Sequence, residues 1–252
     1  MIGLAQKPLA GKKGFVLGIA NEHSLAYGCA QAFRALGADL AVTYLNDKAK
    51  PFVAPLAQEL DASIFLPVDV REPHQLEDVF EAMAGTWGRL DFALHAIAFV
   101  PREDLHGRLT DCSRNGFLQA MDVSCHSFMR MAWLAEPLMH DGGALFTMSY
   151  YGADKALEHY NVMGPVKAAL ETAVRYLAYE LGPRGIRVHA ISPGPVNTRA
   201  DDLQELAAKG APAKRLISIE DVGAAVALLA TDYAKLITGE TLYVDGGYHI
   251  MG

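Results

Sequence analysis

Short apolar runs alternate with longer segments of helical periodicity along almost the whole chain of 252 residues. The first run, FVLG, stops at Gly18, as a buried parallel strand would. Runs of strand character lie at 15–18, 39–44, 63–68, 90–99, 144–148, 187–191 and 241–244. Helical patterns lie at 25–36, 50–60, 75–86, 111–139 and 219–231, with a further long one that extends to 181. This alternation predicts one α/β domain over residues 1–252: a Rossmann-like, doubly wound parallel sheet of about seven strands with helices on both faces.

The composition argues against several other classes of protein. The formal net charge of −7 disfavours broad binding to nucleic acid or to an anionic membrane surface. No apolar run reaches the length of a membrane span, and the N-terminus lacks the continuous apolar segment of a signal peptide. The three cysteines, Cys29, Cys112 and Cys125, are not closely spaced. We therefore expect neither a disulfide framework nor a metal site. We also expect the protein to lie in the reducing environment of the cytoplasm.

The turn after the first strand has the pattern G-x5-S-x-A-x-G from Gly18 to Gly28. In an α/β protein this turn can bind the phosphates of a dinucleotide, because a helix N-terminus offers free N–H groups and Gly18 allows close approach of the backbone. Ser24 could cap the helix or bond a phosphate. The spacing fits an ordinary strand–helix turn with a serine cap equally well.

The ends of the second and third strands could contribute to the same dinucleotide site. The second strand ends in Tyr44-Leu45-Asn46, which has neither the acid that binds ribose hydroxyls nor the base that binds a 2′-phosphate. The third is followed by Asp69, which could accept from an adenine amino group, and by Val70, which could pack on the ring. Asp69 could instead cap the next helix. His95, in the apolar fourth strand, reads as a core histidine.

The stretch from 145 to 181 contains Tyr150, Tyr160 and Lys167. Two phenols and an amine can form a proton-handling set, because a nearby ammonium lowers the pKa of a tyrosine. Tyr160 and Lys167 are seven residues apart, which is two helical turns and predicts that both project from one helix face. Pro165 lies between them and is tolerated only in a first turn, so the helix could begin late. Simple packing roles are the alternative.

These motifs together resemble the short-chain dehydrogenase/reductase superfamily over nearly the whole chain. The features that carry the resemblance are the glycine-containing first turn, Asp69-Val70, the SPGPVNT segment at 192–198 and the VDGG tail at 244–247. Ordinary members have Tyr-x3-Lys, whereas this chain has Tyr-x6-Lys with Tyr150 ten residues upstream. That arrangement is similar to the NADH-dependent enoyl-acyl-carrier-protein reductases of bacterial type II fatty-acid synthesis.

The resemblance implies hydride transfer from NADH to the β-carbon of a trans-2-enoyl thioester. Tyr160 would donate to the developing enolate oxygen, Lys167 would hold the nicotinamide ribose, and Tyr150 would shape the pocket. Val100 would contact substrate. The implied cofactor contacts are Gly18, Ser24, Leu25, Leu45, Asp69, Val70, Ile97, Lys167, Val196, Asn197, Thr198, Arg199 and Ala200. NADH is the favoured cofactor, because no basic residue adjoins Leu45 to bind the 2′-phosphate of NADPH. NADPH is the alternative cofactor.

The resemblance also implies partners. Residues 199–218 would form a substrate loop, and its cations Arg199, Lys209, Lys214 and Arg215 could dock an acidic acyl carrier protein, although an ordinary solvated loop explains them equally well. The last strand and the VDGG tail imply a homotetramer. Two other functions stay open: another short-chain carbonyl reductase or dehydrogenase with an atypical catalytic spacing, and a non-catalytic dinucleotide sensor.

Overall fold

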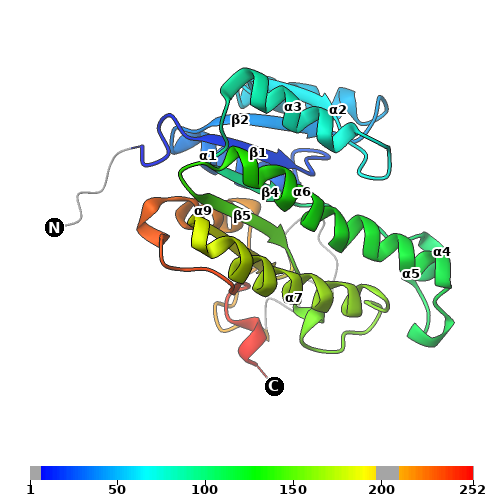
Figure 1. Cartoon of the computed structure of the whole chain (residues 1–252). Coiled ribbons are helices and arrows are strands. Elements are labelled where there is room, and N and C mark those ends of the chain that lie inside the picture. The colour runs from blue at the N-terminus through cyan, green and yellow to red at the C-terminus, as the bar shows by residue number, and fades with distance from the viewer. Residues whose placement is uncertain (1–6, 197–209, 252) are drawn as a thin grey trace.

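The computed structural model describes residues 7–196 and 210–251. In this part of the chain, seven parallel strands form one twisted sheet in the order β3-β2-β1-β4-β5-β6-β7 (Figure 1). The strands are β1 (Lys13–Leu17), β2 (Asp39–Tyr44), β3 (Ile64–Pro67), β4 (Phe92–His95), β5 (Gly143–Met148), β6 (Ile186–Pro193) and β7 (Thr241–Val244). The predicted seven-stranded, doubly wound α/β fold is confirmed.

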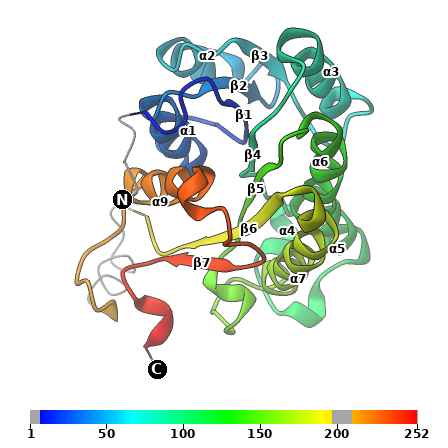
Figure 2. The ribbon, with the colours of Figure 1, turned by 60° about the vertical axis from the view of Figure 1, so that its left-hand side comes forward.

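Helices cover both faces of the sheet (Figure 2). They are α1 (Leu25–Ala35), α2 (Lys50–Glu59), α3 (Gln75–Trp87), α4 (Arg102–Leu105), α5 (Arg114–Met121), α6 (Ser127–Ala135), α7 (Met163–Leu181) and α9 (Ile219–Ala230). One buried cluster unites α1, α2 and α9 with one sheet face, and a second unites α3, α6 and α7 with the other. Each fully buried Leu, Phe or Met side chain in these clusters contributes about 1.5–3 kcal/mol of burial free energy.

Helices α1 and α9 cross at very short range because each has a glycine at the contact. A β-carbon at Gly28 would lie 2.4 Å from the Ile219 carbonyl oxygen, and one at Gly223 would lie 2.3 Å from the Gly28 carbonyl oxygen. Gly28, which ends the G-x5-S-x-A-x-G pattern, is therefore required by helix packing.

Two predicted elements differ in the structure. The single helix expected at 111–139 is interrupted by a π-helical turn at Asp122–His126 between α5 and α6, and it ends in a 3-10 turn at Glu136–Leu138. The strand expected at 90–99 ends at His95, so Ile97 lies in the loop beyond it. Apolar sequence beyond His95 covers a cavity rather than extending the sheet.

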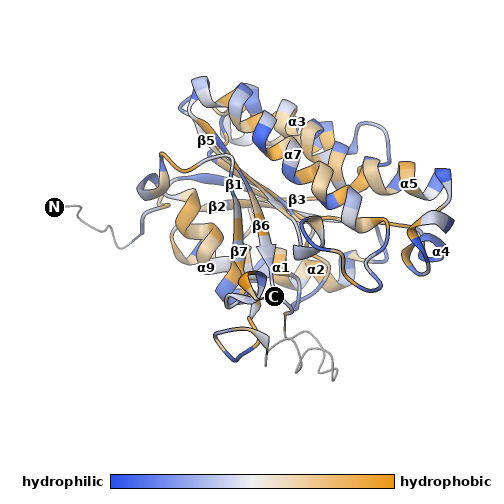
Figure 3. Cartoon of the chain, turned by 90° about the horizontal axis from the view of Figure 1, so that it is seen from below, coloured by the Kyte–Doolittle hydropathy of each residue, from blue (hydrophilic) through white to orange (hydrophobic). Residues whose placement is uncertain are grey.

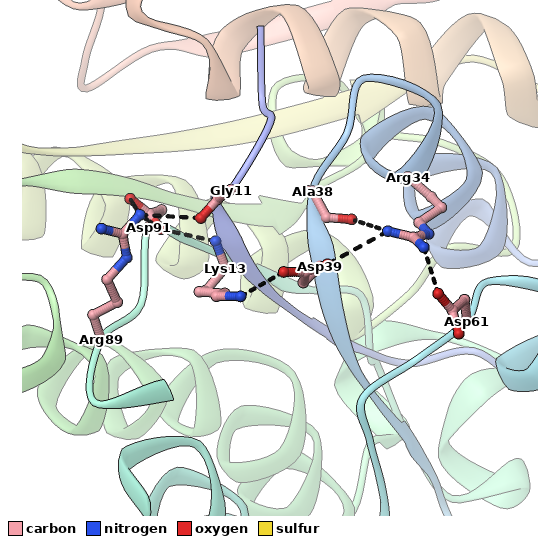
Figure 4. Close-up of polar contacts among 8 residues, drawn as sticks. All are labelled: Gly11, Lys13, Arg34, Ala38, Asp39, Asp61, Arg89 and Asp91. Atoms are coloured by element: carbon pink, nitrogen blue, oxygen red, sulfur yellow. Dashed lines mark hydrogen bonds and ion pairs between the residues drawn. The ribbon is translucent and has the colours of Figure 1, made fainter. Parts of the chain in front are cut away.

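Ion pairs tie together the amino ends of the strands, at the edge opposite the site described below (Figure 4). Lys13 Nζ binds Asp39, and the Lys13 backbone N–H donates to Asp91 Oδ2 at 2.8 Å. Arg34 binds Asp61 at 2.6 Å. The Lys13 contacts link β1 to the starts of β2 and β4, and the Arg34 contact links α1 to the segment before β3.

Hydrophilic residues gather on loops and outer helix faces (Figure 3). Within the described residues, none of the helices combines the length and apolarity needed to cross a membrane.

Candidate active site

The carboxyl ends of β1 to β4 surround a cavity of about 340 Å³. Parallel strands bring their carboxyl ends to one edge of a sheet, where doubly wound folds bind ligands. Five of the predicted cofactor residues line this cavity, one or two from each strand end: Gly18, Leu45, Asp69, Val70 and Ile97.

Gly18 is a position where only glycine fits. Its φ of +118° is in a region that other residues rarely adopt, and a β-carbon there would lie 2.3 Å from the Ala96 carbonyl oxygen. The close approach predicted at Gly18 therefore exists within the protein itself, between β1 and the chain leaving β4.

Ser24 precedes α1 as its N-cap residue, but its side chain does not cap the helix. Its Oγ instead accepts hydrogen bonds of 3.0 Å from the backbone N–H groups of Ala20 and Asn21. The hydroxyl shapes the turn and leaves the first turn of α1 without a side-chain cap. A helix N-terminus of this kind attracts anionic groups such as phosphates.

Asp69 is bound by a cation, Arg71, that was not among the predicted site residues. Arg71 Nη2 lies 2.6 Å from Asp69 Oδ2, and Arg71 Nε lies 2.9 Å from Oδ1. The Arg71 guanidinium holds the pKa of Asp69 below its ordinary value. Arg71 also stacks over the Phe99 ring at 5.2 Å and lines the cavity. Because Arg71 follows Asp69 by only two residues, the sequence spacing alone could have indicated this ion pair.

The two tyrosines meet beyond the end of β5. Their rings lie 5.0 Å apart between centroids, tilted by 52°. Tyr150 leaves β5 in an extended conformation, whereas Tyr160 lies in a turn between two residues with positive φ, His159 at +63° and Asn161 at +44°. Such values are costly for non-glycine residues and cluster at functional sites. The Asn161 side chain secures this turn by donating to the Asp104 carbonyl oxygen at 3.0 Å.

Lys167 is buried, with 5% of its surface exposed. Its Nζ donates to the carbonyl oxygen of Met148, the last residue of β5, at 2.6 Å. Burial lowers the pKa of Lys167 to about 8, while Cys125 and Glu171 act in the opposite direction.

Two predictions about this group are wrong. Tyr160 does not share a face of α7 with Lys167, because α7 begins at Met163 and places Pro165 in its first turn. The pKa of Tyr160 is raised rather than lowered, because burial opposes the phenolate and Tyr150 and Glu171 act in the same direction. Burial also raises the pKa of Tyr150.

His95 is a satisfied core residue, as its apolar strand indicated. Its ring nitrogens lie 3.2 Å from Thr147 Oγ1 and 2.7 Å from Ser127 Oγ. Burial lowers the pKa of His95 to about 3, so the ring is neutral near pH 7.

The remaining predicted residues lie apart from the cavity lining. Val100 is partly buried and packs against the buried cluster on the α3, α6 and α7 face of the sheet, and Val196 forms an isolated bridge with Ile217. Ser24 and Leu25 stand at the start of α1. Asn197, Thr198, Arg199 and Ala200 lie outside the described residues. All three cysteines are unpaired, and the described residues contain no group of His, Cys, Asp or Glu side chains placed to bind a metal ion.

A doubly wound sheet with this cavity, followed by a tyrosine pair and a buried lysine, defines a nicotinamide-dependent oxidoreductase of the short-chain dehydrogenase type. The family model described as enoyl-(acyl carrier protein) reductase matches residues 18–249. The chain belongs to that family.

Individual relatives are similar over nearly their whole length. The NADH-dependent enoyl-[acyl-carrier-protein] reductase 1 of Rhizobium meliloti is 45% identical over 249 residues, which cover 96% of this chain and 92% of that protein. The Anaplasma phagocytophilum reductase, solved in complex with NAD, superimposes with a TM-score of 0.95 at 44% identity over 98% of this chain and 97% of that one. The Bacillus cereus reductase, solved with NADP+ and an indole naphthyridinone, superimposes with a TM-score of 0.94 at 38% identity. The match covers 98% of this chain and 99% of that one.

Proposed function

We propose that this chain reduces the 2,3 double bond of a trans-2-enoyl thioester carried by acyl carrier protein, with NADH as reductant. It is an oxidoreductase, as its family membership and its 45% identity to an NADH-dependent enoyl reductase indicate. The observation that carries the proposal is the position of Tyr160 and Lys167. Lys167 bonds the last residue of β5, and Tyr160 contacts Tyr150 just beyond that strand. β5 pairs with β4, and the loop after β4 lines the cavity.

The residues around the cavity fit a dinucleotide. Val70 and Ile97 provide apolar walls for a planar ring, and Asp69 provides an acceptor for an amino group. The first turn of α1, with Ser24 and Leu25 at its start, is suited to the pyrophosphate. Leu45 would adjoin the adenine ribose. Residues 196–200 would complete the nicotinamide end. When bound, NADH supplies the hydride.

Tyr160 stabilises the charge that develops on the thioester oxygen. Reduction at the β-carbon moves electron density to that oxygen, and a hydrogen-bond donor aimed at it lowers the barrier. A tyrosine with a raised pKa remains protonated and able to donate near pH 7. Tyr150, in contact with the same ring, shapes the pocket.

Lys167 supplies positive charge beside the ribose and the reacting centre. Its pKa of about 8 leaves it mostly protonated at neutral pH. Its bond to the Met148 carbonyl uses one of three ammonium protons, so two stay available for ribose hydroxyls.

Val100 and the loop at 199–218 would contact the acyl chain and its carrier. Of the candidate docking cations, Arg215 is already paired with Asp221 at 2.7 Å, whereas Arg199 and Lys209 lie outside the described residues. Lys214 is the other candidate within the described part.

We further propose that the chain acts as a single domain within a cytoplasmic homotetramer. Exposed apolar side chains on several elements support the assembly. They are Phe117, Leu118, Met129, Trp133, Tyr176 and Tyr179 on α5, α6 and α7, and Leu228, Leu236, Ile237 and Leu242 on α9, on β7 and in the segment between them. β7 is an edge strand, which a second copy could cover (Figure 2).

A comparison of substrates tests the activity. Oxidation of NADH is measured with a crotonyl thioester and with a 3-oxoacyl thioester, each repeated with NADPH. We expect turnover of the enoyl thioester. Turnover of the 3-oxoacyl thioester alone would identify a carbonyl reductase, and nucleotide binding without either reaction would identify a sensor.

A further inference from the structure

Two charged residues, one helical turn apart on α7, hold two successive residues at the end of β5. Lys167 Nζ donates to the Met148 carbonyl oxygen at 2.6 Å. Glu171 Oε1 accepts from Ser149 Oγ at 2.5 Å. Residues at i and i+4 project from the same face of a helix, so both bonds come from one side of α7.

Ser149 is also bonded to the sheet through its backbone. Its backbone N–H donates to the Ile191 carbonyl oxygen of β6 at 2.7 Å, and only 4% of the residue is exposed. The next residue is Tyr150, where the chain leaves the sheet and meets Tyr160. The orientation of Tyr150 therefore depends on a peptide fixed by β6 on one side and α7 on the other.

We propose that Glu171 is a positioning residue that fixes Ser149 and the exit of the chain toward Tyr150, and that its carboxylate, one helical turn from Lys167, complements the charge of the lysine ammonium. The inference rests on the proposed function of Tyr160 and Lys167. It assigns two roles to a half-buried carboxylate outside the cavity. Glu171 would help to place Tyr150, which contacts Tyr160, and would support the charge of Lys167.

The charges around Lys167 favour this role. Burial lowers the pKa of Lys167, and Cys125 in the π-helical turn and Glu171 on α7 both raise it. On β4, burial and the charge of Lys167 lower the pKa of His95, so its ring is neutral. Glu171 also raises the pKa of Tyr160 and of Tyr243 on β7.

Without the Glu171 charge, the pKa of Lys167 falls further below its ordinary value, so the lysine loses its proton at lower pH. Functions that need the ammonium then decline earlier as the pH rises.

Three variants separate the two parts of the proposal. Glu171→Gln retains an acceptor for Ser149 Oγ but removes the charge. Ser149→Ala removes the hydrogen bond but retains the charge. Glu180→Gln removes a carboxylate from an exposed position of the same helix and serves as the control. Circular dichroism and thermal unfolding check that each variant is folded.

The readouts are the pH profiles of NADH affinity and of kcat/KM for a crotonyl thioester. We expect Glu171→Gln to move the alkaline decline of both profiles to lower pH. We expect Ser149→Ala to lower kcat about tenfold across the range without moving that decline, because misplaced groups slow the reaction. Glu180→Gln should match the parent protein.

A Glu171→Gln profile that superimposes on the parent profile would overturn the charge role. A shift of equal size in Glu180→Gln would also overturn it. Unchanged kcat in Ser149→Ala would overturn the positioning role. The affinity profile needs no turnover, so failure of the parent protein to reduce the enoyl thioester would count against the proposed function and leave the charge role under test.

Discussion

The ring of Tyr160 lies directly against Gly152. A β-carbon at position 152 would be 2.3 Å from Tyr160 Cδ1, well inside van der Waals contact. The two residues belong to the segment between β5 and α7, and their contact sets where the phenol lies. A glycine is therefore needed for the shape of the active site, at a position with no chemistry of its own.

Gly152→Ala should displace the Tyr160 ring and lower kcat by about 10- to 100-fold, since small misplacements of a catalytic group have effects of that size. NADH affinity should change little, because the cavity lies at other strand ends. Steady-state kinetics and fluorescence titration measure the two. The control is Gly85→Ala on α3, where no atom lies within 4 Å of the added methyl group. Equal kinetics for both variants would contradict the packing argument.

Tyr160→Phe removes the hydroxyl and retains the ring packing. We expect kcat to fall by about 100-fold or more, the usual effect of losing one donor to a developing oxyanion. The dissociation constant of NADH should stay within about twofold, because the proposed partner of the Tyr160 hydroxyl is the thioester oxygen, whereas the ribose contact is assigned to Lys167. Full turnover in this variant would remove Tyr160 from the mechanism.

Lys167→Ala should lower turnover and also weaken NADH binding. In the parent protein, binding should weaken as the pH rises through about 8, because the folded-state pKa of Lys167 is lowered to that value and the neutral amine no longer contributes charge. The variant should lose this pH dependence. Isothermal titration at several pH values measures it, and an affinity equal to that of the parent protein would refute the assignment of Lys167 to the cofactor.

Ser218→Ala should lower the free energy of unfolding by about 1 kcal/mol, since Ser218 and Asp221 form a capping box at the start of α9. Thr172→Ala, at an exposed position of α7, should change it by at most about 0.5 kcal/mol. Urea unfolding compares the two, and equal effects would contradict the cap.

The ionisation of Asp221 also makes the free energy of unfolding depend on pH in the acid range. Arg215 and Ser218 lower the pKa of Asp221 to about 2. A lowered carboxyl pKa contributes stability above the unfolded-state value, which is about 3.8, and this contribution is lost as the pH falls through about 2. Asp221→Asn should therefore reduce the loss of stability between those pH values in acid unfolding curves.

Much of the fold could be predicted because it follows from local pattern. The bounds predicted at 39–44 and 241–244 agree with those of β2 and β7. Buried parallel strands read as apolar runs, and the alternation of strands and helices leaves few other topologies. The cavity residues Gly18, Asp69 and Ile97 were predictable for the same reason, since each follows a strand.

The features that differed depend on contacts between residues far apart in sequence. Tyr160 leaves the helical pattern because Asn161 bonds to Asp104 and Gly152 packs on the phenol ring, and neither contact appears in the periodicity. Burial raises the pKa of Tyr160, which spacing to Lys167 alone could not reveal. Arg71 was overlooked because its pairing with Asp69 and stacking on Phe99 are tertiary facts.

We expect this active site to reduce a carbon–carbon double bond. Transfer of deuterium from NADH labelled at the nicotinamide C4 tests it directly, with mass spectrometry and NMR of the product formed from a crotonyl thioester. We predict a saturated butyryl thioester with one deuterium at C3. Absence of the saturated product, or label found only on a carbinol carbon when a 3-oxoacyl thioester is supplied, would contradict it.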